Sequence, residues 1–174
     1  MDTKDFEYFN EGVSMEGQCV AVLTNEVTGK KRVYEGKNII TTKGNRWYAA
    51  RGAIEASAFA VVVMRVGLNS TAASAGDADV LTSIQGSGYA SITAGYPKSS
   101  DADTDNTGRG SNIVTWAVTF AAASMSMTGI REVALTDSYA SPANNINRAL
   151  FAAAFDKTTS DTLKIFINHT FQGV

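Results

Sequence analysis

The last third of the chain alternates apolar and polar side chains with a period of two. Along residues 112–121 four large apolar side chains share one face: Val114, Trp116, Val118 and Phe120. The segment from Leu163 to Phe171 repeats the pattern. A period of two puts every second side chain on the same side of an extended chain, so each segment is predicted to be a half-buried strand.

Between these two segments, 130–135 and 148–155 are predicted to be short strands bounded by turn residues. Strands are also predicted upstream at 18–24, 31–35 and 59–66, and residues 87–93 alternate weakly. Gly29 supplies the positive φ of the turn between 18–24 and 31–35. Short strands at roughly regular spacing predict an antiparallel sandwich or barrel. We favour a mainly β, single-domain antiparallel β-sandwich, Ig-like or jelly-roll-like.

One short helix is predicted near residues 44–56. Trp47, Ala50 and Ile54 follow the spacing of one buried helical face. Thr41 or Thr42 precedes this stretch and is a candidate N-cap.

The first sixteen residues differ from the rest of the chain. They are polar and acidic, yet they hold Phe6, Tyr8 and Phe9. A purely disordered tail seldom carries three aromatics so close together. We therefore predict an extended arm over 1–16 that becomes ordered by docking its rings on another surface, followed by one domain over 17–174.

The composition suits a domain that has a hydrophobic core and whose surface is largely covered by neighbouring subunits. The chain has 174 residues, of which 44% are hydrophobic and 18% charged, below the roughly 25% charge typical of soluble domains. The net charge of −2 provides no global field for nucleic acid. Charge is uneven, because residues 1–29 hold six acids against one lysine and residues 30–51 hold seven bases against one acid. Such complementary segments would set the register of subunits packed head to tail; the alternative is solvated charge that contributes little.

The inventory of reactive side chains predicts no enzyme and no cofactor. Cys19 is the only cysteine, so no intrachain disulfide forms, and it is predicted to be a small buried hydrophobe. His169 is the only histidine, which excludes multi-histidine metal sites and favours a core or rim position. No nucleophile elbow or phosphate-binding glycine motif is present. No signal peptide or bilayer-length apolar run is found, so no membrane partner is expected.

The loop that contains residues 101–105 is a candidate calcium site. Asp101, Asp103 and Asp105 are spaced like the first three ligands of an EF-hand loop. However, Asn106 and Asn112 replace the glycine and the closing glutamate of that motif, and no helices flank it. The alternative is a solvated acidic loop within an exposed stretch over 97–111.

Residues 130–135 carry a charge in each of their two side-chain rows, Arg131 in one and Glu132 in the other. This favours a sheet edge or an inter-subunit surface, where either residue pairs with a neighbouring chain. The alternative is a local, exposed ion pair of little energetic weight.

The order of several short motifs resembles small virion structural proteins of tailed bacteriophages, β-sandwich proteins encoded among head and tail genes. The likeness covers roughly residues 17–172 and rests on Thr28-Gly29-Lys30, Asn38-Ile39-Ile40, Gly44 with its short helix, Val114-Thr115-Trp116, residues 129–135, Arg148-Ala149-Leu150-Phe151 and residues 157–163. The resemblance implies a non-enzymatic virion component, made in the bacterial host cytoplasm.

We expect a capsid decoration (cement) protein, a homo-oligomer and preferably a trimer, with the major capsid protein or other virion proteins as partners. The residues expected to bind partners are Phe6, Tyr8 and Phe9 in the arm, the basic patch Lys30, Lys31 and Arg32, and Arg131 and Glu132. One alternative is a tail, collar or fibre-associated protein. Another is a carbohydrate-binding host-recognition module that uses Trp47, Tyr89, Tyr96 or Tyr139. A hydrolase is the least favoured reading.

Overall fold

The computed structural model describes residues 14–56, 59–77, 88–99, 101–139 and 144–172. Nine strands pair antiparallel in one sheet, in the order β4-β3-β7-β8-β2-β1-β9-β6-β5. Their bounds are β1 Ser14–Asn25, β2 Lys31–Ile40, β3 Val63–Gly67, β4 Tyr89–Ser91, β5 Lys98–Ser99, β6 Ile113–Phe120, β7 Met127–Thr136, β8 Asn147–Lys157 and β9 Asp161–Gln172. The prediction of a mainly β, antiparallel, single-domain fold with one helix is confirmed.

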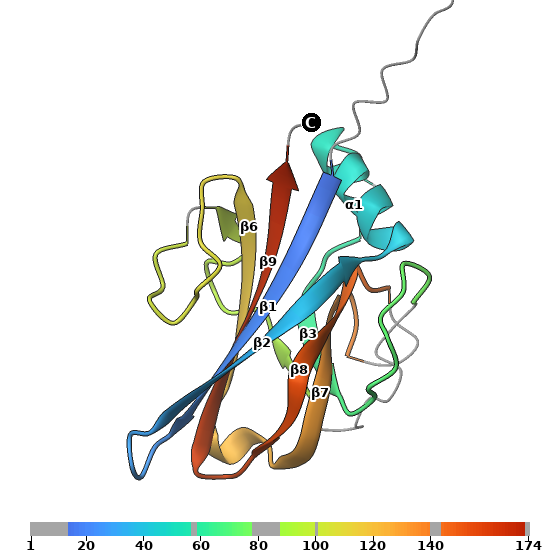
Figure 1. The fold of residues 1–174 in the computed structure, drawn as a ribbon. Helices are drawn as coiled ribbons and strands as arrows, with labels where there is room; N and C mark the ends of the chain where they lie inside the picture. The colour runs from blue at the N-terminus through green and yellow to red at the C-terminus, as the bar shows by residue number, and fades with distance from the viewer. Residues whose placement is uncertain (1–13, 57–58, 78–87, 100, 140–143, 173–174) are drawn as a thin grey trace, which may run out of the picture.

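All nine strands belong to one sheet, and this sheet curls so that one of its faces encloses the core (Figure 1). The amide of Thr93, just after β4, donates to the carbonyl of Ala117 in β6 at 2.8 Å, so the two ends of the sheet meet. The enclosed core includes Leu23, Met64, Trp116, Val118, Leu135, Phe151 and Ile165. The alternation predicted for β6 and β9 therefore does place one face of each strand in the core.

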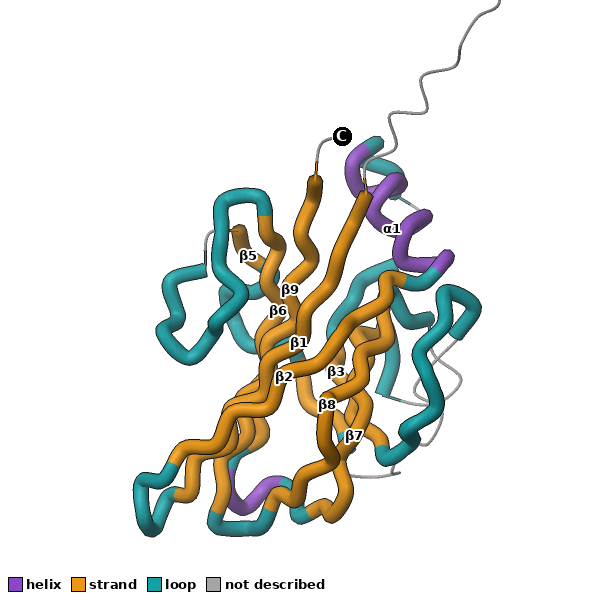
Figure 2. Tube along the Cα trace, viewed as in Figure 1, coloured by secondary structure: helices purple, strands orange, loops and turns teal. Residues whose placement is uncertain are grey.

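The opposite face of these strands is also covered, which the alternation did not predict. Val20, Val22, Ala117 and Phe166 form a second buried cluster, against which Tyr96 packs. Figure 2 shows the long loop after β5 lying beside β6 on this outer side. Asp101 and Asn106 in that loop are buried, so the prediction of an exposed loop over 97–111 is wrong at these positions. Hydrogen bonds between polar side chains, rather than apolar burial, hold it down.

Helix α1 spans Thr42–Gly52. Thr41 is its N-cap, since its hydroxyl accepts the amide of Gly44 at 2.9 Å. Trp47 is buried and donates its indole N–H to the carbonyl of Phe59 at 2.7 Å. The predicted extension to residue 56 is wrong, because the chain turns at Ile54, which has φ 59 and is 91% exposed rather than packed on the core.

The start of β1 and the extent of the pairing between β2 and β8 define the end of the sheet next to α1. Strand β1 begins at Ser14 and pairs with β9 from there, so residues 14–16, predicted to be part of the arm, belong to the sheet. Strand β2 pairs with β8 only over Gly36–Ile40, and beyond that point its ladder partner is β1. Within the described residues, no helix is long and apolar enough to cross a membrane.

Candidate functional site

A groove of about 1200 Å³ opens between α1 and the neighbouring ends of β1, β2 and β9. The side chains that line it are mostly apolar: Met15, Ile39, Ile40, Tyr48, Ala49 and Phe171. Glu16, Lys37, Asn38 and Asn45 add polar groups. It lies where the chain enters the sheet at Ser14, beside the predicted arm. We call it the arm-root groove.

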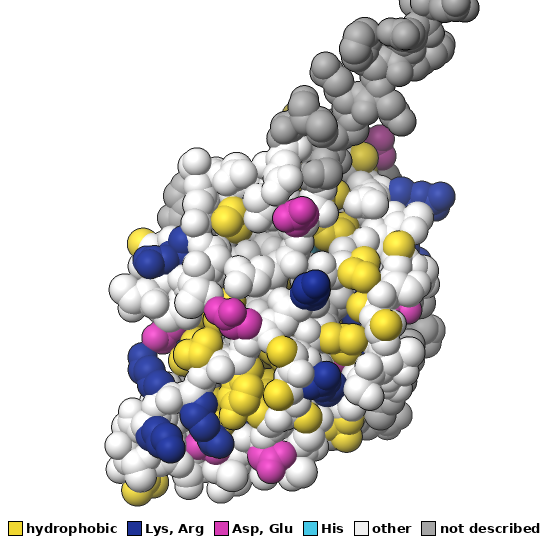
Figure 3. Space-filling view, in the orientation of Figure 1, with side chains coloured by type: hydrophobic (Ala, Val, Ile, Leu, Met, Phe, Trp, Pro, Cys, Tyr) yellow, Lys and Arg dark blue, Asp and Glu magenta, His cyan; other side chains and the backbone are white. Residues whose placement is uncertain are grey.

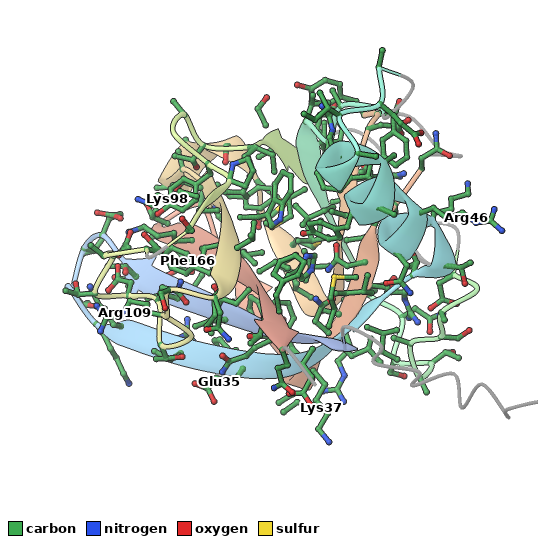
Figure 4. The ribbon with its side chains drawn as sticks, turned by 90° about the horizontal axis from the view of Figure 1, so that it is seen from above. Glu35, Lys37, Arg46, Lys98, Arg109 and Phe166 are labelled. Atoms are coloured by element: carbon green, nitrogen blue, oxygen red, sulfur yellow. The ribbon has the colours of Figure 1, made fainter. Side chains whose placement is uncertain are left out.

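Apolar side chains reach the surface around this region. Ile39 is 37% exposed, and Val33 on the same strand is 53% exposed. On the face drawn in Figure 3, hydrophobic side chains emerge over β1, β2 and β8 between scattered charged ones. In Figure 4, Lys37 extends from β2 and Arg46 from α1, both away from the body of the protein. The groove thus combines an apolar lining with one lining base, Lys37, and one lining acid, Glu16.

Beneath the groove lies a buried polar cluster. The Tyr48 phenol is hydrogen-bonded to Nδ1 of His169, and Trp116 donates its indole N–H to the same phenol oxygen at 3.3 Å. Burial lowers the pKa of His169 to about 3 and raises the pKa of the Tyr48 phenol. The histidine is therefore neutral at pH 7, far from the range of an effective general base. His169 is fully buried, as the sequence predicted.

Gly17 explains how these polar side chains fit together. It lies between Asn38 on β2 and His169 on β9 in the strand register. A Cβ at Gly17 would fall 2.1 Å from Nδ2 of Asn38, so only glycine leaves room for the amide. Asn38 Nδ2 and His169 Nε2 are buried and make no hydrogen bond within the described part of the chain. Buried polar atoms normally have hydrogen-bond partners, so these two atoms mark incomplete polar packing next to the groove.

The carboxylates proposed for calcium have cations of this chain as partners. Asp101 contacts Lys98 at 3.0 Å, Asp103 contacts Lys164 at 3.1 Å, and Asp105 contacts Lys31 at 2.8 Å and Lys164 at 3.2 Å. Among the residues that the structure describes, no three His, Cys, Asp or Glu side chains converge as a metal site. Ion pairs therefore link this loop to Lys31 on β2 and Lys164 on β9. These contacts do not support the calcium hypothesis.

The pKa values follow these contacts. The hydrogen bond from Lys31 lowers the pKa of Asp105, with Lys164 adding to it against the effect of burial. Burial opposes ionisation of Asp101, but hydrogen bonds from Asn106 and Lys98 outweigh it and its pKa is lowered. Burial likewise opposes the charge of Lys164, yet Asp103 and Asp105 raise its pKa. These charged forms are therefore stabilised by the fold.

The expected partner-binding residues are not brought together. Lys30 and Arg32 are exposed on the β1–β2 hairpin, and Lys31 beside them reaches Asp105. Phe6, Tyr8 and Phe9 lie outside the described residues.

The prediction that Glu132 pairs with a neighbouring chain is wrong. It is fully buried and accepts a hydrogen bond from Nε of Arg148 at 2.8 Å. Arg148 also contacts Asp77 at 2.9 Å and the carbonyl of Thr71 at 3.0 Å, so this network pins the loop after β3 to the sheet. The physical reason is position, because β7 lies between β3 and β8 in the sheet. Arg131, on the other face, is half-buried.

Comparisons with protein-family models, with curated proteins and with solved structures find no match to this chain. The groove residues, which the sequence did not single out, come from four separate elements. Chemically, their arrangement offers an apolar surface with one base, Lys37, one acid, Glu16, and the amides of Asn38 and Asn45.

Proposed function

We propose that the protein is a non-enzymatic virion structural protein, a head decoration (cement) protein that binds across junctions between capsomers. The observation that carries this proposal is the arm-root groove, an apolar cleft at the point where an aromatic-rich arm joins the sheet. A binding segment next to a binding cleft is what a protein that assembles with other subunits requires. The resemblance in motif order over residues 17–172 supports the assignment to a tailed phage.

The mechanism is linkage between binding and assembly. A protein that binds the assembled lattice and not the free capsomer adds its binding free energy to the stability of the shell. In an oligomer, several weak contacts act together through effective concentration, so no single subunit needs to bind tightly. The curled, well-packed sheet supplies the rigid body, and a trimer placed over capsomer junctions would present three copies of the basic hairpin to the major capsid protein.

Two surfaces are assigned to this binding. The first is the arm with Phe6, Tyr8 and Phe9, because aromatic rings bury large areas with few rotatable bonds. The second is the basic hairpin, where Lys30 and Arg32 are exposed and Lys31 is shared with Asp105. Acidic surfaces on a capsomer would be attracted to it, mainly through the rate of association.

The test is a binding assay with particles stripped of the protein. A variant lacking residues 1–13 removes the arm and leaves β1 whole, whereas a cut after residue 16 would also remove three residues paired with β9. We expect the shortened protein to fold and to lose particle binding. Unchanged occupancy would contradict the proposal. Copy number then separates the assignments, since decoration scales with the number of capsomers and a tail, collar or fibre protein is present in few copies.

A carbohydrate-binding module is the second candidate, favoured by one feature. Tyr89 and Tyr139 form an edge-to-face pair with ring centroids 5.0 Å apart, and Tyr139 is 49% exposed. The other two expected aromatics are less suited, because Trp47 is buried and Tyr96 packs on the outer cluster. Glycan-array binding that is lost in Tyr139→Ala would support this function over decoration.

A further inference from the structure

We propose that the arm-root groove binds residues 5–9 of the arm of a second copy of this chain, so that subunits are joined head to tail by exchanged arms. The inference rests on the proposed function in taking the arm as a binding segment. It concerns copies of this chain alone, however, and is tested without phage particles.

The first argument is the match of shape and polarity. Residues 5–9 read Asp-Phe-Glu-Tyr-Phe, and in an extended chain Phe6 and Tyr8 project to the same side. The groove offers the side chains of Met15, Ile39 and Phe171 as an apolar lining. Two aromatic rings placed there would cover surface that is otherwise open, including the exposed part of Ile39.

The second argument is charge. Residues 1–13 hold four acids and one lysine. Helix α1, one wall of the groove, carries Arg46 and no acidic residue, while its other two bases have partners elsewhere, Lys43 with Asn144 and Arg51 with the carbonyl of Phe59. Lys37 stands on the opposite wall (Figure 4). Lys37 and the nearby Arg46 would attract an acidic segment to the groove, against one lining acid, Glu16.

The third argument is an unsatisfied donor. Asn38 lines the groove and is only 7% exposed, and within the described residues its Nδ2 has no hydrogen-bond partner. An extended segment in the groove presents main-chain carbonyl groups along its length. One such carbonyl can accept from Asn38 Nδ2 while Asn38 Oδ1 keeps its hydrogen bond from Asn147 Nδ2 at 2.6 Å, which removes the penalty of a buried, unpaired donor.

The direction of the chain favours a second copy over the chain's own arm. The sheet pairing continues out to Ser14 opposite Gln172, so the arm starts from the end of β1. To enter its own groove, the chain would have to reverse within residues 10–13 and place Glu11 close to Glu16, a like charge on the groove. The four residues 10–13 that link the docked segment to Ser14 span up to about 13 Å when extended, so the neighbouring molecule's groove would have to lie close to the start of β1.

The experiment uses two complementary variants and measures mass in solution by light scattering. The donor variant, Ile39→Glu, keeps its arm and carries an acid in the groove. The acceptor variant lacks residues 1–13 and keeps its groove open. We expect the full chain to be an oligomer, each variant alone to be a monomer, and their mixture to form one-to-one pairs.

The matched control is Val33→Glu, which puts the same charge on an exposed apolar side chain of the same strand, away from the groove. It is expected to stay oligomeric. A labelled peptide of residues 1–13 should bind the acceptor variant, and Ile39→Glu made in that variant should weaken binding by at least about tenfold. If Ile39→Glu does not fold, Ala49→Glu on the exposed side of α1 tests the same contact.

Three results would overturn the inference. The first is a peptide that binds the acceptor variant while the full chain is a monomer, which would assign the groove to the chain's own arm. The second is a peptide that does not bind the acceptor variant at all. The third is a groove variant that remains oligomeric like Val33→Glu. None of these results depends on particle binding, so failure of the decoration assignment is recognised separately, by an intact oligomer that does not bind particles.

Discussion

The phenol of Tyr48 is hydrogen-bonded to Nδ1 of His169, and this contact joins helix α1 to β9, the last strand along the chain. The two rings meet edge to face with centroids 5.6 Å apart, and the indole of Trp116 donates to the same phenol. The floor of the arm-root groove is therefore held by neutral polar groups inside an apolar core. Its integrity depends on His169 remaining unprotonated.

Stability should fall with acid because of His169. Burial holds its pKa at about 3 against an ordinary value of 6.5, so between these values the unfolded chain binds a proton that the folded chain does not. The stabilisation is complete above pH 6.5 and declines below it, by up to about 1.4 kcal/mol per pH unit. Urea unfolding between pH 7 and 5 measures the slope. His169→Gln should flatten it by one proton, and equal slopes in the two proteins would contradict the assignment.

The buried pair of Glu132 and Arg148 should show a strong asymmetry between single and double variants. Glu132→Ala leaves a fully buried guanidinium without its Nε partner and should cost about 3–5 kcal/mol of unfolding free energy. Glu132→Leu combined with Arg148→Met should recover much of that loss, because both charges are then absent. Denaturant titration provides the values.

The control for this pair is Lys31→Ala, which breaks the exposed contact with Asp105 and should cost less than about 1 kcal/mol. A Glu132→Ala variant no less stable than Lys31→Ala would show that the buried pair does not hold the loop after β3.

The strands were predictable because alternation directly reports which side chains face a core. Val118 and Ile165 are fully buried as their pattern indicated. The end of the helix was not predictable in this way, since the spacing of Ile54 fits a helical face while its backbone has turned to φ 59. Burial of Asn106 was also missed, because it depends on amide contacts with Asn168, a residue 62 positions away in sequence.

The candidate site was harder to predict for a related reason. Met15, Ile39 and Ala49 carry no local signal of a groove, since each belongs to a different element and only the fold brings them together. Glu132 was misread because a charge in a strand indicates exposure unless a partner is supplied from elsewhere. The partner is Arg148, placed nearby by the register that sets Glu132 opposite Leu150. The role of Phe6, Tyr8 and Phe9 stays a prediction.

The loop over residues 101–110 should be stabilised by lysines and not by a metal ion. Lys164 contacts both Asp103 and Asp105, so Lys164→Met should lower the melting temperature by a few degrees, consistent with about 0.5–1 kcal/mol for a partly exposed pair. EDTA should leave the melting temperature of the wild type and of Asp103→Ala unchanged. A drop caused by EDTA in the wild type alone would restore the calcium hypothesis. Differential scanning calorimetry makes both measurements.

Two glycines of helix α1 should respond in opposite directions to the same change. Replacing glycine by alanine in a helix normally stabilises it by about 0.5–1 kcal/mol, because the unfolded chain loses freedom. Gly52→Ala should show that gain, since its Cβ would meet nothing within 4 Å. Gly44→Ala should destabilise, because its Cβ would lie 1.9 Å from the carbonyl oxygen of Ile146, a backbone atom that cannot move without shifting β8. Equal melting temperatures for the two variants would mean that α1 is not packed against residues 145–147, and the groove wall would then lose its anchor.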